Sequence, residues 1–211
     1  MACVHLPTSI GEAIDKLTIL DIKLERITDA NRKADVQREH DALLKQSELN
    51  NFVQTHADLY NTMKKANAII WDMMDVLRTD ISTEEYLKTC KDCIEFNDIR
   101  FRIKARINQA SNSELREQKS YKATMFKLAI MGLHESHAPI VTRIMRRPLQ
   151  YYGILYDEVQ IVYAHQPVED ASATLTFNDD DISRIMTNEL QLKQRIYDAL
   201  NVSDAIMDKL M

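Results

Sequence analysis

Along the first 130 residues, hydrophobic side chains recur every three or four positions, which is the spacing of one face of an α-helix. Ser9 and Glu12 are spaced as a capping box, so we expect a first helix over residues 9–28. Residues 34–78 carry the same periodicity, with a kink allowed near SELNN. An unbroken helix of that length would be about 65 Å long.

Two further helices are expected before residue 132. Ser82 and Glu85 form a second capping box, which predicts a helix over residues 83–109. The polar turn QASNS then precedes a fourth predicted helix over residues 113–131. Neither glycine nor proline, the residues that break helices, occurs between Gly11 and Gly132. The predicted fold is therefore mainly α, with long antiparallel helical hairpins forming a bundle over residues 1–131.

Residues 132–211 form a separate, small C-terminal subdomain in this interpretation. The runs EVQIVYA and SATLTF are rich in β-branched residues, yet Leu149, Tyr152, Tyr156 and Val159 keep a helical period. We favour a mostly helical subdomain that can include one short β-hairpin. The run NDDDISRIMTNELQLKQRIYDAL predicts a helix, and SDAIMDKLM predicts a short last one.

Composition excludes several classes of function. Hydrophobic residues make up 45% of the 211 positions, which is enough for a core. The net charge is -5, so we expect no basic surface for nucleic acid. Apolar stretches are shorter than the roughly 18 residues of a membrane helix, so no membrane association is expected. Three cysteines without a disulfide pattern indicate a cytoplasmic protein.

Two pairs of acidic residues form the first candidate site, a magnesium centre. Residues three apart share a helix face, so two neighbouring helices could bring four carboxylates to one Mg²⁺ ion. This layout resembles that of all-α nucleoside triphosphate pyrophosphohydrolases, although the first pair is Asp rather than Glu. The alternative is that such pairs arise by chance on solvated helices. The candidate ligands are Asp72, Asp75, Glu95 and Asp98.

A second candidate site is a polar groove between the first helix and the helix over 83–109. Polar residues about one turn apart lie beside the apolar face of each helix, and bundles build ligand sites between facing helices. The alternative is a set of ion pairs that specify how the helices pack. The groove residues are Glu12, Asp15 and Lys16 on the first helix and Asn97, Arg100 and Lys104 on the other.

The segment GLHESHAP holds His134, Glu135 and His137 at the predicted boundary. In the helical zinc-protease motif, the spacing of the two histidines places both on one helix face. The H-E-x-H spacing here is one residue shorter than that. We therefore interpret these residues as ordinary loop polarity.

The segments SIGEAIDKLTILDIKLERI, FNDIRFRIKARIN and SELREQKSYK together resemble an uncharacterised family of short helical proteins from bacteria and their phages. The resemblance covers residues 8–122 and implies a helical fold without a catalytic assignment. No catalytic residue is assigned from the sequence.

The leading functional hypothesis is a non-enzymatic assembly or adaptor protein, a homo-oligomer or a partner of another protein, with a coiled-coil-like surface. It requires no cofactor. The first alternative is a Mg²⁺-dependent pyrophosphohydrolase that uses the four carboxylates. The second is binding of a small ligand in the polar groove.

Overall fold

A computed structural model describes residues 6–118, 123–178 and 188–211. The chain is mainly helical, as predicted, and carries a small sheet of three parallel strands in its described part. It divides into two compact units, residues 1–120 and 121–210. The division falls before the predicted boundary at residue 131, because the segment that precedes Gly132 belongs to the second unit.

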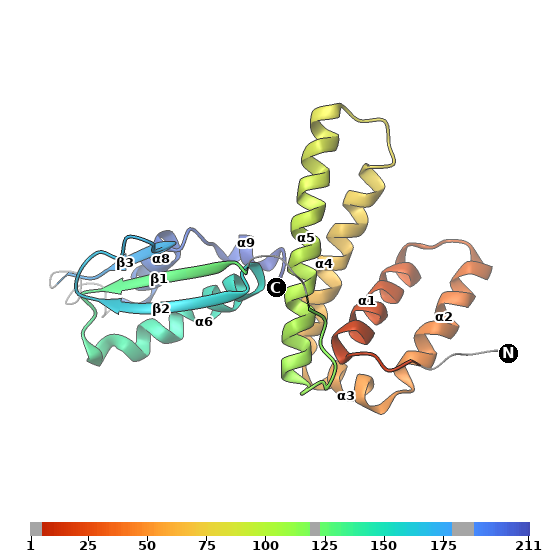
Figure 1. Cartoon of the computed structure of the whole chain (residues 1–211), viewed down its shortest axis with the longest axis horizontal. Helices are drawn as coiled ribbons and strands as arrows, with labels where there is room; N and C mark the ends of the chain where they lie inside the picture. The colour runs from red at the N-terminus through yellow and green to blue at the C-terminus, as the bar shows by residue number, and fades with distance from the viewer. Residues whose placement is uncertain (1–5, 119–122, 179–187) are drawn as a thin grey trace. The chain divides into compact units, whose positions relative to one another are not determined.

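The N-terminal unit is built around α1 (Ile10–Arg26), which packs on α4 (Ala57–Val76) and α5 (Thr83–Ala110). In Figure 1, α4 and α5 lie side by side and are joined by a short connection. The central part of the hydrophobic stripe of α1 is buried, as its helical spacing predicts. The largest side chains of this core are Ile14, Leu17, Leu20, Ile22, Met63, Ile103 and Ile107.

The prediction of one continuous helical stretch over residues 34–78 is wrong, although one break does fall at the kink allowed near SELNN. The structure has three helices there: α2 (Ala30–Leu44), α3 (Ser47–Thr55) and α4. His56 separates α3 from α4 with non-helical backbone angles, φ -130° and ψ 47°. Its ring stacks on Phe52, and Phe52 and Leu49 are buried. Burying these two side chains requires the chain to turn, which a straight helix does not allow.

α2 lies against α1 without burying any of its own residues. Its contacts are polar instead: Nε2 of His40 lies 2.9 Å from a carboxylate oxygen of Asp21, and Lys16 pairs with Glu39 at 2.9 Å. Asp21 of α1 also binds α4, because the hydroxyl of Tyr60 on α4 donates to its other carboxylate oxygen at 2.7 Å. Burial is the largest cause, and this hydrogen bond the next largest, of a raised pKa for Tyr60. Directional polar contacts therefore help to hold α2 on α1.

The C-terminal unit has a parallel sheet in the order β2-β1-β3. A short 3-10 turn, η1, and then α6 connect β1 to β2, and α6 runs alongside these strands (Figure 1). The core lies between the sheet and the helices α6 and α8, where Leu128, Met145 and Leu192 are fully buried. The elements are β1 (Met125–Met131), η1 (Glu135–His137), α6 (Ala138–Leu155), β2 (Glu158–Ala164), β3 (Ala173–Thr176), α8 (Glu189–Ala199) and α9 (Asp204–Asp208).

Three predictions for this region need correction. The predicted helix over residues 113–131 is wrong, because residues 125–131 form the central strand β1. The helical interpretation of Val159 is also wrong, since it lies in β2. EVQIVYA and SATLTF do contain strands, but these pair with β1 in parallel rather than with each other as a hairpin. Of the helix predicted over NDDDISRIMTNELQLKQRIYDAL, residues 179–187 lie outside the described part, and the remainder forms α8.

Candidate functional site

The amino end of α1 meets α5 closely because residue 11 has no side chain. A Cβ atom at Gly11 would lie 2.7 Å from the backbone oxygen of Lys104 and 2.8 Å from Oδ1 of Asn108. The Gly11 N–H instead donates to that Oδ1 atom at 2.7 Å. Ser9 caps the helix, since its hydroxyl accepts from the Glu12 N–H at 3.1 Å. This approach brings the first two turns of α1 against polar side chains of α5.

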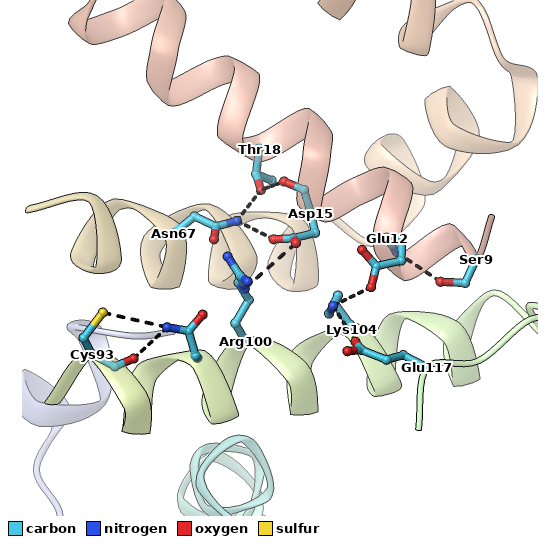
Figure 2. Close-up of polar contacts among 10 residues, drawn as sticks. Ser9, Glu12, Asp15, Thr18, Asn67, Cys93, Arg100, Lys104 and Glu117 are labelled. Carbon is cyan, nitrogen blue, oxygen red and sulfur yellow. Dashed lines mark hydrogen bonds and ion pairs between the residues drawn. The ribbon is translucent and has the colours of Figure 1, made fainter. Parts of the chain in front are cut away.

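Lys104 lies between two carboxylates at this contact (Figure 2). Its ammonium is 2.5 Å from an oxygen of Glu12 and 2.5 Å from an oxygen of Glu117. Burial alone would lower the pKa of Lys104, but the hydrogen bonds to Glu117 and Glu12 outweigh burial and raise it. The ammonium therefore stays charged and joins the start of α1 to the segment after α5.

A second polar group lies one turn further along α1, around Asp15. The side chain of Asp15 is only 8% exposed. Its carboxylate accepts from Nδ2 of Asn67 on α4 at 2.7 Å and pairs with Nε of Arg100 on α5 at 4.0 Å. Nδ2 of Asn67 also donates to the hydroxyl of Thr18 at 3.0 Å. Figure 2 shows these side chains converging from three helices, so a buried charge is paired and hydrogen-bonded.

A cavity of about 430 Å³ adjoins this group, and we call it the inter-helix cavity. Asn67 and Arg100 line it, so the buried network reaches the cavity wall. Arg78 and Asp75 also line it and pair with each other at 3.3 Å. The apolar part of its wall comes from Ile19, Ile70, Trp71 and Met74.

The structure brings four of the six predicted groove residues together. Glu12 and Lys104 form one pair, and Asp15 and Arg100 form another, all between α1 and α5. The other two predicted residues are engaged elsewhere. Lys16 pairs with Glu39 of α2, and the side-chain amide of Asn97 donates to the backbone oxygen of Cys93 at 2.8 Å.

Both aspartates of the first predicted magnesium-binding pair are engaged by arginines. Asp72 pairs with Arg26, and the hydrogen bond from Arg26 lowers the pKa of Asp72. Asp75 pairs with Arg78, which lies in the turn directly after α4. Within residues 6–118, 123–178 and 188–211, no three His, Cys, Asp or Glu side chains are arranged to hold a metal ion. Convergence of these aspartates with Glu95 and Asp98 on one ion stays a prediction.

Sequence reasoning missed Asn67, Trp71 and Arg78 as parts of the candidate site. Asn67 had a readable signal, because it interrupts an apolar stripe between Met63 and Ile70. A polar residue on a buried helix face requires a partner from another element. Arg78 had no such signal, since it lies in the exposed last turn of the helical stretch.

None of the helices in the described part of the chain is both long and apolar enough to cross a membrane. No curated protein and no solved structure matches the chain. Residues 4–129, more than half of its length, match a family of unknown function, DUF6165. This match confirms the resemblance to an uncharacterised family seen over residues 8–122 and extends it into β1. The chain belongs to the DUF6165 family.

Proposed function

We propose that the N-terminal unit binds a small organic anion with a planar apolar part in the inter-helix cavity. The observation that carries this proposal is the position of Arg100. Its Nε atom pairs with the buried carboxylate of Asp15, while its side chain lines the cavity and is 29% exposed. Because Asp15 orients the guanidinium, the group is pre-positioned to donate to a ligand.

The cavity wall fits an amphipathic ligand. Its volume of about 430 Å³ lies within the range of small-molecule sites, and most such sites combine apolar walls with a few polar groups. The indole of Trp71 offers a flat apolar surface. Arg78 and Arg100 bring two guanidinium groups to the same cavity, where Arg78 pairs with Asp75 and Arg100 pairs with the buried Asp15. A carboxylate attached to an aromatic ring matches this arrangement.

Phenylacetate is a suitable probe, with uncharged phenylacetamide as its matched control. Trp71 is the only tryptophan in the chain, so its emission reports directly on the cavity. We expect saturable binding of phenylacetate by Trp71 fluorescence and by calorimetry, and about tenfold weaker binding of phenylacetamide. Arg100→Gln should weaken phenylacetate binding about tenfold, because a charge-assisted hydrogen bond contributes about 1.5 to 3 kcal/mol.

Two further variants make this test specific. Arg78→Gln removes an exposed cavity arginine and should weaken binding without unfolding the protein. Arg38→Gln removes an exposed arginine of α2 outside the cavity and should leave binding unchanged. Equal affinity for the acid and the amide, or unchanged affinity in both cavity variants, would show that the arginines do not select an anion.

A second candidate function, assembly through α5, is favoured by an exposed apolar stripe on that helix. Leu87 is 56% exposed and Ile94 is 66% exposed, and they lie two turns apart on one face. An antiparallel copy of α5 would place Leu87 of one chain beside Ile94 of the other. The same pairing brings Lys88 close to Glu95 of the copy, so the charges beside the stripe are complementary. We propose a second copy of this chain as the occupant.

Light scattering after size-exclusion chromatography tests the assembly. We expect a dimer for the wild-type chain and a monomer for Ile94→Asp, because a charge at a two-fold contact is buried twice. Lys88→Glu should weaken the dimer, and adding Glu95→Lys should restore it. Leu190→Asp, at an exposed leucine of α8, is the matched control and should remain dimeric. A monomeric wild-type chain would refute the assembly.

A further inference from the structure

The C-terminal unit contains a second cavity, of about 630 Å³, at the carboxyl ends of β1 and β2. The two strands are parallel and in register, so their carboxyl ends meet at the same edge of the sheet. Residues from the ends of both strands and from the segments that follow them line it. Cavities of roughly 300 to 1,000 Å³ hold small organic molecules. We call this feature the sheet-edge cavity.

The chain leaves β1 and β2 toward opposite faces of the sheet at this edge. Phe126 of β1 stacks on Tyr152 of α6 with ring centroids 3.8 Å apart, so the connection from β1 covers that face. Neighbouring strand residues point to opposite faces. Lys127 pairs with Asp170, which lies in the segment that follows β2, so that segment crosses the other face. Parallel sheets bind ligands in the crevice where two such connections diverge.

The chemistry of the sheet-edge cavity favours an anion. His134 and His137 follow β1, and His165 follows β2, so both connections supply an imidazole. Ser136 adds a hydroxyl, which lies 2.8 Å from Nδ1 of His134, and within the described part of the chain no carboxylate lines the cavity. The cavity also adjoins the amino end of α6, whose helix dipole is positive there.

The hydrogen bonds around His134 prepare its ring as a donor. The backbone N–H of Ser136 donates to Nδ1 of His134 at 3.3 Å. Because Nδ1 acts as the acceptor, the neutral ring carries its proton on Nε2. The ring of His137 lies nearby, with its centroid 6.2 Å from that of His134. These histidines are not arranged as metal ligands together with any third His, Cys, Asp or Glu in the described residues.

We propose that the sheet-edge cavity binds a small organic phosphate that carries a planar ring. The three imidazoles donate to the phosphate oxygens, and the hydroxyl of Ser136 donates to Nδ1 of His134 at 2.8 Å and holds that ring in place. The ring lies against Tyr163, an aromatic residue of β2 that lines the cavity and is largely exposed. This site is separate from the inter-helix cavity and does not depend on the function proposed for it.

Adenosine monophosphate is the probe, and adenosine and inorganic phosphate test its two parts. Calorimetry on the full chain should show AMP binding at least tenfold more tightly than either part. The double variant His134→Gln with His165→Gln should weaken AMP binding at least tenfold. Both side chains are exposed, so we expect the variant to keep the helical circular dichroism of the wild-type chain.

Two controls assign the binding to the sheet-edge cavity. Lys209→Gln removes an exposed cation of the same unit that does not line the cavity, and it should leave AMP binding unchanged. Saturating phenylacetate, which occupies the inter-helix cavity, should also leave AMP binding unchanged and so separates the two sites. The proposal is overturned if AMP gives no heat of binding, if the double histidine variant binds AMP like the wild type, or if phosphate alone binds as tightly as AMP.

Discussion

Replacing Gly132 with alanine should destabilise the C-terminal unit by about 3 to 5 kcal/mol. Gly132 directly follows β1 and has a φ of +68°. This conformation costs an L-residue with a side chain about 1 to 2 kcal/mol. A Cβ atom at this position would also lie 2.0 Å from the backbone oxygen of Phe177. That oxygen cannot move freely, because the Phe177 N–H is bonded to the backbone oxygen of Met131 at 2.8 Å.

Peptide-resolved hydrogen exchange measures the loss of stability separately for the two units. In Gly132→Ala, amides of β1 and α6 should exchange much faster, while those of α1 and α4 stay protected. Asn201→Gly is the control, since Asn201 has a φ of +50° that glycine adopts without strain. Equal protection of β1 in Gly132→Ala and wild type would mean that the chain relaxes around the new methyl group.

Replacing Asp15 with alanine should destabilise the N-terminal unit by about 3 kcal/mol. The change leaves Nδ2 of Asn67 with one acceptor fewer and removes the carboxylate that faces Arg100. Removing one partner of a buried pair costs more than the pair contributes, because the remaining polar group has no water to bond. Urea denaturation followed by the emission of Trp71 measures the loss.

Two matched variants identify the cause of that loss. Asp15→Asn keeps an oxygen for Asn67 and should cost clearly less than alanine. Asp35→Ala removes an exposed aspartate that pairs only along its own helix, and it should change stability by less than about 0.5 kcal/mol. A loss for Asp15→Ala no larger than that for Asp35→Ala would contradict a structural role for the buried network.

The two proposed ligand sites use different parts of the fold. The inter-helix cavity depends on side chains that three helices bring together, and the family match covers all of its residues. The sheet-edge cavity depends on the direction in which the chain leaves two parallel strands. Only β1 up to residue 129 lies within the family match, so the histidines that line this cavity lie outside it.

The candidate site was partly predictable because the position of some polar residues can be inferred from their neighbours in the sequence. Glu12, Asp15, Arg100 and Lys104 lie beside apolar stripes, so their helices alone direct them toward a common boundary. Lys16 and Asn97 were expected in the same groove but are engaged elsewhere. The long side chain of Lys16 at the edge of its helix can turn to either side. Which side it takes depends on neighbours such as Glu39, which helical spacing does not place.

By itself, the sequence determined the helices whose signals are local. Ser9 and Ser82 cap α1 and α5 as their spacing predicts, and the stripe of α1 forms the core. Tertiary structure alone decided that residues 125–131 form a strand, because a strand needs β2 and β3 to satisfy its backbone hydrogen bonds. Both cavities and the Asp15–Asn67–Arg100 contact also form only in the tertiary structure. These features join residues far apart in the chain, and no local pattern encodes which distant element a polar group will meet.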